Sequence, residues 1–365
     1  MDIVLLNKEN EATWNEFCLQ SADAWFWHTK YWMDYVINYR PEFQPEQLSF
    51  FIKENNELLA ICPLILEKNN DIKKFSFSDF GVPVPAFSDK LPVKIQKKVQ
   101  NYIFEHIDAM ALELGVKKAT FRFSPLAKVY VQPKNHPANY LLKYGYLDAS
   151  FNTQILDIFA DPGTLKTAVR KGHKYDINRS GKIMESRIFD SKSITKEDFD
   201  LYCQLHHKDA GRVTRPQITF DLMYEWIKQG KAVLVGAKLK ENCQYVGFSY
   251  HIVYKNGAYY ASSASDPVCE DMPIAHFILW ESISWLRNNQ VRFFEIGWQF
   301  YGGELHYQAS DKECQIAKFK RGFGGEKVPQ LIAEKYFDTE LFMLEYLKKI
   351  GYYKKYLEAK KTEKK

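Results

Sequence analysis

Two segments late in the chain combine the residue types that a group-transfer site needs. The first, residues 293–299, is a β-branched and aromatic run that breaks at a glycine and holds one carboxylate, Glu295. The second, residues 316–326, places Phe319 and Lys320 in a basic and aromatic turn closed by glycines. Strand ends and glycine turns are where α/β proteins place chemistry. A lysine there can stabilise developing negative charge, and a carboxylate can accept a proton.

Further candidate binding residues are basic. Arg170, Lys171 and Lys174 fall on one predicted helix, and such a basic helix suits contact with phosphate, although a solvated helix face has the same pattern. Arg212 and Arg215 follow the end of another predicted helix. Paired arginines in a loop can clamp a carboxylate or a phosphate, so we count both among the substrate-binding candidates.

An early aromatic segment, residues 24–32, gathers rings around Trp27 and His28. It fits a helix start with buried rings, capped by Thr29, and it also fits an aromatic wall of a substrate cleft. On the second interpretation, Trp27 and His28 would contact the substrate.

Three single residues complete the set of candidates. His276 falls near a predicted helix N-terminus, which favours a neutral imidazole, although a single histidine there is more often structural. Tyr260 lies in a predicted strand followed by small residues that allow a ligand to approach the backbone. Gln299 closes the segment that holds Glu295. We expect Tyr260 and Gln299 to bind substrate, and Glu295 or His276 to accept a proton.

Motifs for several other chemistries are missing from the sequence. It has no G-x-x-x-x-G-K-[ST] phosphate loop, no G-x-G-x-x-G dinucleotide fingerprint and no G-x-S-x-G nucleophile elbow. The six cysteines form no C-x-x-C pair, and His206 and His207 are adjacent rather than four apart. We therefore expect no metal site and no bound cofactor.

Composition bounds the class and the compartment. The chain has 365 residues, which favours two domains, and a formal charge of +5, which permits an anionic ligand. The N-terminus lacks the pattern of a signal peptide, and no uncharged run reaches membrane-spanning length. These features favour a cytoplasmic protein, either free or at the inner face of the membrane. Lysines cluster at the C-terminal end, which predicts a solvated helix end or, as the alternative, an anchor to acidic lipid or RNA: Lys354, Lys355, Lys360, Lys361, Lys364 and Lys365.

Periodicity predicts the same kinds of element in both halves of the chain. The main predicted helices and strands lie at residues 48–52, 58–66, 91–114, 118–123 and 151–158 in the first half, and at 165–180, 184–189, 196–209, 221–228, 232–239, 245–254, 258–263, 273–288, 291–296 and 340–359 in the second. We predict an α/β (α+β) fold of two tandem modules, residues 1–160 and 161–365, each a mixed sheet flanked by helices, with a C-terminal helix in the second.

In their order along the chain, these segments resemble the Fem family of peptidyl transferases (FemA, FemB and FemX types), within the GNAT acyltransferase superfamily. The likeness rests on the basic helix at 169–181, the helix and strand at 273–297, the Phe319-Lys320 pair and the early segment at 28–32. It implies two GNAT-like modules and transfer of an aminoacyl or acyl group onto an amine. It also implies that Lys320 stabilises charge near the reacting ester and that Phe319 helps to position it.

The resemblance implies an aminoacyl-tRNA donor and a cell-envelope acceptor, which is a peptidoglycan peptide or an amino sugar and either a small molecule or lipid-linked. The interval from Ile296 to Lys320 leaves no room for the helical-hairpin arm of some members, and the lysine that should follow Trp32 is missing. Two alternatives stay open. One is a coenzyme A dependent N-acetyltransferase of a nucleotide-linked amino sugar, although the signature [Q/R]-x-x-G-x-[G/A] fails at Glu326. The other is a non-catalytic protein that binds RNA or glycan; DNA is not expected as a partner.

Overall fold

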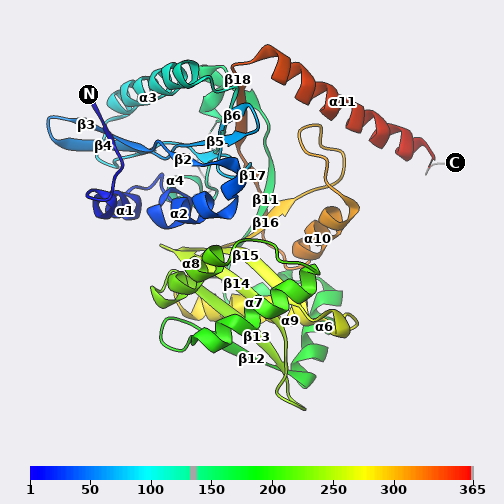
Figure 1. Cartoon of the computed structure of the whole chain (residues 1–365). Coiled ribbons are helices and arrows are strands. Elements are labelled where there is room, and N and C mark those ends of the chain that lie inside the picture. Colours follow the sequence, from blue (N-terminus) through cyan, green and yellow to red (C-terminus); the bar gives the residue numbers. More distant parts are fainter. Residues whose placement is uncertain (132–137, 363–365) are drawn as a thin grey trace. The chain divides into compact units, whose positions relative to one another are not determined.

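The structure, a computed structural model, describes residues 1–131 and 138–362 (Figure 1). The chain divides into two compact units, and it passes between them four times. The first unit comprises Met1–Thr153, Trp298–Ala317 and Val328–Lys365, and the second comprises Gln154–Gly297 and Lys318–Lys327. The division at residue 160 stays a prediction. The C-terminal helix, however, groups with the first unit, whereas the sequence had suggested the second.

The first unit contains two sheets, with strand orders β1-β3-β4-β8 and β10-β18-β9-β6-β5-β2, and β7 also pairs with β9. Its strands are β1 (Asp2–Leu5), β2 (Glu46–Gln47), β3 (Phe50–Glu54), β4 (Glu57–Cys62), β5 (Ile65–Asn69), β6 (Ile72–Phe75), β7 (Val82–Pro83), β8 (Ala86–Phe87), β9 (Lys118–Arg122), β10 (Leu147–Asp148) and β18 (Ile332–Tyr336). Its helices are α1 (Glu11–Gln20), α2 (Lys30–Tyr39), α3 (Val93–Leu114), α4 (Lys128–Val131) and α11 (Thr339–Thr362).

Helix α3 shows how the sequence sets these elements. Val99, Ile103 and Ile107 recur at helical spacing and are buried in the core of the first unit. Gly115 ends the helix in a left-handed conformation (φ +67°), and its N–H caps the last turn through the carbonyls of Ala111 and Leu112. The helix therefore returns the chain to β9, which runs parallel to β6.

The second unit is built on a sheet of strand order β12-β13-β14-β15-β16-β11-β17. Its strands are β11 (Phe151–Asp157), β12 (Met184–Phe189), β13 (Ala232–Leu239), β14 (Tyr245–Tyr254), β15 (Gly257–Ser265), β16 (Phe293–Gln299) and β17 (Glu326–Gln330). Of these, β11 begins with residues of the first unit, and β16 and β17 end with residues of the first unit. Its helices are α5 (Pro162–Ala168), α6 (Lys171–Ile183), α7 (Lys196–Ala210), α8 (Gln217–Lys228) and α9 (Ile274–Asn288). Aliphatic and aromatic side chains of α9 and β16 share one buried core, so the helix fixes the position of the strand.

The mixed α/β class and the tandem organisation are confirmed, and two local predictions are wrong. The helix predicted over residues 165–180 is two helices, because Val169 and Arg170 adopt extended backbone between α5 and α6. The turn predicted around Lys320 is instead a helix, α10 (Asp311–Arg321). Lys364 and Lys365 of the predicted basic tail lie outside the described residues. Among those that are described, no helix is both long and apolar enough to cross a membrane.

Candidate active site

The candidate site of the second unit lies where two parallel strands part. β15 and β16 pair in register at three positions, the last of which joins Tyr259 to Glu295. Beyond that point β15 stays on β14 through a β-bulge near His251, and β16 continues beside β11. Bulges bend a strand and re-aim its side chains. The divergence therefore separates Tyr260 from the end of β16 and leaves space that side chains must fill.

Lys320 fills this space from the last turn of α10. Its Nζ lies 5.5 Å from the centre of the Tyr260 ring, within the range of a cation–π contact. On the other strand, Nζ lies 2.7 Å from the position that a Cβ on Gly297 would occupy. Gly297 also has φ +102°, a backbone conformation that side chains disfavour. Two features therefore require a glycine at this position: the positive φ of the backbone and the close approach of the Lys320 ammonium group.

Burial sets the charge state of Lys320. It lowers the pKa of the ammonium group to about 8, and the negative charge of Glu295 acts in the opposite direction. Glu295 is itself 1% exposed and lies two residues before Gly297 on β16. At neutral pH Lys320 is therefore mostly protonated, yet poorly solvated. Such a cation is a strong electrostatic donor because little water competes for it.

On the β15 side, aromatic side chains surround the Lys320 ammonium group's neighbour, Tyr260. The His251 ring stacks on Tyr260 at 5.5 Å, and it meets Phe294 edge-on at 5.3 Å. Burial lowers the pKa of His251 to about 3, so its imidazole is neutral at physiological pH. Its Nε2 lies 2.7 Å from the Ser249 hydroxyl. His251 was not predicted from the sequence, and it acts here as a packing group that supports Tyr260.

Phe319 and His276 belong to a neighbouring cluster. The His276 ring meets Phe319 at 4.8 Å and His173 at 4.4 Å, and its Nε2 lies 3.6 Å from a carboxylate oxygen of Asp176. Burial, followed by the nearby His173, lowers the pKa of His276 to about 4. His173 is buried and lies with Nε2 2.9 Å from the Phe319 carbonyl oxygen. This cluster anchors the end of α10, and so it holds Lys320 in place.

The basic candidates lie on the surface of the second unit. Arg170 occupies the N-cap position of α6 and places Nη2 3.0 Å from His173 Nδ1. Lys171 is exposed, and Lys174 donates to the Thr167 carbonyl at 3.1 Å. These contacts tie two of the three basic side chains to local structure, while their charges remain at the helix N-terminus.

The two loop arginines differ from each other. Arg212 is exposed, whereas Arg215 is half-buried with its guanidinium 5.1 Å above the Phe220 ring. Arg215 Nη2 also lies 3.2 Å from His206 Nε2, which lies 2.9 Å from the Thr214 hydroxyl. Burial, then the charge of Arg215, lowers the pKa of His206 to about 4. His206 was missed as part of this arrangement, because its partners lie in the loop after the helix.

Trp27, His28 and Gln299 belong to the first unit, and all three are buried. Both ring nitrogens of His28 are engaged: Nδ1 lies 3.2 Å from the Trp25 amide, and Nε2 lies 2.9 Å from the Val84 carbonyl. Thr29 caps α2 by accepting from the Trp32 amide. These contacts agree with the helix-start interpretation of the aromatic segment. Within the described residues, no group of side chains has the composition of a metal site.

Each unit contains a strand, a helix and a second strand that runs parallel to the first and then separates from it: β6, α3 and β9 in the first unit, and β15, α9 and β16 in the second. This repeated arrangement defines a tandem GNAT fold. The structure of FemX shares this fold with the chain, with a TM-score of 0.68 and 11% identity over 94% of this chain and 99% of FemX. L-PGS from Bacillus licheniformis matches with a TM-score of 0.58 and 11% identity over 93% of this chain and 96% of its own. A tandem GNAT protein from the clavulanic acid biosynthesis pathway matches with a TM-score of 0.52 and 11% identity over 92% of this chain and 98% of that protein.

No protein-family model and no curated protein matches the sequence. The likeness is therefore one of three-dimensional structure, and at 11% identity it establishes the fold.

Proposed function

We propose that the chain is an N-acyltransferase that moves an aminoacyl or acyl group onto an amine of a cell-envelope precursor. The observation that carries this proposal is the position of Lys320, whose poorly solvated ammonium group lies at the parting of β15 and β16 against Gly297. The FemX-like fold supports the same class of reaction.

Amide formation from an ester or thioester has three requirements: a neutral amine, stabilisation of the tetrahedral oxyanion, and alignment of the two substrates. The amine nitrogen forms the new bond to the carbonyl carbon, and the bond to the leaving oxygen or sulfur breaks. Lys320 would stabilise the negative charge of the intermediate or of the leaving group. One well-placed donor of this kind lowers a barrier by roughly 3–4 kcal/mol.

The proton of the amine needs an acceptor. Glu295 is the carboxylate whose charge raises the pKa of Lys320, and it would take the proton directly or through water. His276 is a weaker candidate, since its lowered pKa of about 4 makes it a poor base, and it contacts Phe319 instead. In the proposed mechanism His276 and Phe319 position α10.

The charged surface of the second unit would hold the anionic parts of the substrates. Arg212 and Arg215 follow α7, and Arg170, Lys171 and Lys174 lie at the start of α6. These residues suit phosphate groups, which are shared by tRNA, coenzyme A and nucleotide-linked sugars. Tyr260 would contact the reacting group through its ring beside Lys320.

The experiment offers both kinds of donor to the purified full chain. One set of reactions contains tRNA charged with radiolabelled amino acids, and the other contains acetyl-coenzyme A with a thiol assay. Each set is run with a UDP-linked muramyl pentapeptide and with a UDP-linked amino sugar. Acceptor-dependent loss of label from tRNA supports aminoacyl transfer, and thiol release supports the coenzyme A dependent alternative.

Two controls make the result decisive. Lys320→Met should abolish most of the turnover, while Lys318→Met, an exposed lysine two residues earlier on α10, should leave it unchanged. Binding of charged and uncharged tRNA with equal affinity, without turnover of either donor, would contradict the proposal and favour a non-catalytic RNA-binding protein.

A further inference from the structure

Helix α11 of the first unit has one side that is fixed to the protein. Glu345 lies 2.7 Å from the Lys118 ammonium group and accepts from the Tyr336 hydroxyl at 2.7 Å. One turn further on, Lys349 lies 2.8 Å from Glu334. Glu334 is held by two lysines, and the charge of Lys118 contributes most to lowering its pKa to about 2 against the effect of burial. These partly buried pairs determine which side of α11 faces the unit.

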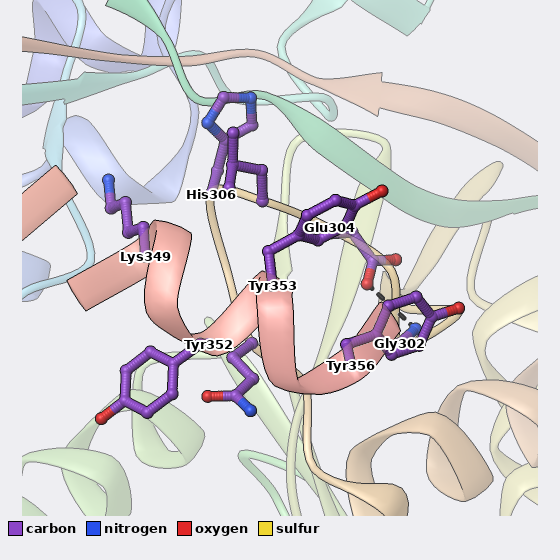
Figure 2. Close-up of a pocket in the computed structure, with 9 residues that line it drawn as sticks. Gly302, Glu304, His306, Lys349, Tyr352, Tyr353 and Tyr356 are labelled. Atoms are coloured by element: carbon purple, nitrogen blue, oxygen red, sulfur yellow. Dashed lines mark hydrogen bonds between the residues drawn. The ribbon is translucent and has the colours of Figure 1, made fainter. Parts of the chain in front are cut away.

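The second half of the helix keeps the same inward side. Tyr352, Tyr353 and Tyr356 line a small, solvent-open hollow of about 30 Å³, together with the loop that carries Gly302 and His306 (Figure 2). A Cβ on Gly303 of this loop would lie 3.2 Å from the Tyr356 hydroxyl. The loop therefore packs against Tyr356 on the inward side, and aliphatic residues on the opposite side stay exposed.

The uncovered side of α11 carries exposed aliphatic side chains. Five aliphatic side chains on this helix are between 45% and 59% exposed: Met343, Leu344, Leu347, Ile350 and Leu357. Four of them, without Leu344, follow one another at intervals of four, three and seven residues, so they form one stripe along the helix. Exposed apolar groups in a contiguous set mark an interaction surface, whereas scattered ones need no explanation.

Lysines lie within and beside the stripe. Lys354 follows Ile350 by four residues, and Lys361 follows Leu357 by four, which places both in line with the aliphatic side chains. Lys348 and Lys355 flank them, and all four are exposed. Glu358 lies 3.8 Å from Lys354 and offsets part of this charge. The uncovered side thus combines aliphatic groups with an excess of positive charge.

We propose that this side of α11 docks on the surface of an anionic lipid bilayer. The aliphatic stripe would enter the boundary between headgroups and acyl chains, and the lysines would reach lipid phosphates with their long side chains. A second copy of the chain fits less well. An interface with two-fold symmetry that buries the stripe would also remove Lys354 and Lys361 from water, because both lysines lie in line with it. The inference does not depend on the proposed activity, and its test uses no turnover.

The test measures co-sedimentation of the full chain with vesicles. We expect binding to vesicles of phosphatidylcholine and phosphatidylglycerol in a 3:1 ratio, weak binding to phosphatidylcholine alone, and loss of binding as salt rises, because added ions screen the surface charge. Leu347→Gln/Ile350→Gln and Lys354→Gln/Lys355→Gln/Lys361→Gln should each lower the apparent affinity by about tenfold or more.

Matched controls come from helix α3. Leu112 is 74% exposed, and Lys97 and Lys98 are exposed on the same helix. Leu112→Gln and Lys97→Gln/Lys98→Gln should bind vesicles as the unmodified chain does. Because every substituted residue is exposed, the variants should unfold at the same temperature as the parent.

Three outcomes would overturn the proposal. The first is equal binding to neutral and anionic vesicles, and the second is an equal loss of binding in the α3 controls. The third is a dimer in sedimentation equilibrium that Leu347→Gln/Ile350→Gln dissociates, with no vesicle binding by the parent chain. That result would assign the stripe to contact between copies.

Discussion

Each unit contains a pair of parallel strands joined through a helix, and the two pairs are completed in different ways. In the first unit, β6 pairs with β9 at Lys74 and Phe75 only, and β7 then takes the place beside β9 from Val82 onward. In the second unit, β15 and β16 part after Tyr259 and Glu295. There the side chain of Lys320 enters from α10.

The aromatic segment, residues 24–32, contacts the chain directly after β7, the strand that replaces β6 beside β9. His28 bonds to the carbonyl of Val84, directly after β7, and the Arg122 guanidinium at the end of β9 lies 5.1 Å above the Trp27 ring. Arg122 is 8% exposed. In the first unit, a strand and packed aromatic rings therefore occupy the place where the two parallel strands separate. In the second unit, the ammonium group of Lys320 occupies that place. On the proposed function, the same topology would supply rigidity in one unit and reactive chemistry in the other.

The largest predicted effect is on Lys320. Lys320→Met should reduce turnover about a hundredfold with the fold retained, because it removes a donor worth roughly 3–4 kcal/mol while keeping an apolar side chain in the space. Single-turnover kinetics beside Lys318→Met measure the effect. Normal turnover in Lys320→Met would contradict the proposal that the two units differ in function where their parallel strands separate.

Paired glycine variants sharpen the comparison. Gly297→Ala should reduce turnover about tenfold, because its Cβ would displace the Lys320 ammonium group. Gly81, which precedes β7, also has a positive φ of +82°, and its added Cβ would lie 3.3 Å from Thr120 Cγ2. Both variants should lose about 1–3 kcal/mol of unfolding free energy through backbone strain. Only Gly297→Ala should slow the reaction, and an equal slowing in Gly81→Ala would contradict the assignment.

The pH dependence tests the charge of Lys320. Turnover should fall as pH rises through about 8, where the buried ammonium group loses its proton. Unfolding does not explain this fall. The folded-state pKa of Lys320 is below its ordinary value, so its deprotonation makes the folded state relatively more stable between the two values. In Glu295→Gln the descending limb should move to lower pH, and in Lys320→Met it should disappear. A limb that stays in place in both variants would assign the titration to another group.

The smallest effect on turnover is expected in the first unit, where β6 and β9 separate. Arg122→Met removes a cation above a buried ring and should lower the unfolding free energy by about 1–2 kcal/mol, with turnover unchanged. Chemical denaturation measures the first quantity, with the exposed Lys97→Met as the control. A large loss of turnover at unchanged stability would show that the first unit's parting also takes part in the reaction.

Local sequence patterns predicted most elements because their signals are local. The bounds of β12, β13 and β14 agree with prediction. The signal is clearest in β14, which is rich in β-branched and aromatic residues. Helix α10 was missed because its eleven residues bury only Ala317 and show no apolar periodicity. The break between α5 and α6 was missed as well, because it falls at Val169 and Arg170 rather than at a proline or glycine, and the nearby Gly172 lies inside α6.

By itself, the sequence determined the mixed α/β class, the recurrence of similar elements in the two halves, and the residues on which the proposed acyl transfer depends. These are Lys320, Glu295 and Gly297, which follows Glu295 by two residues. Tertiary structure decided which of these residues meet. It placed Lys320 between Tyr260 and Gly297, grouped His276 with Phe319 instead, and buried Trp27 and His28 beside β7. The physical reason is that strand pairing and its interruption bring together residues far apart in sequence, and no local pattern records where a ladder of hydrogen bonds stops.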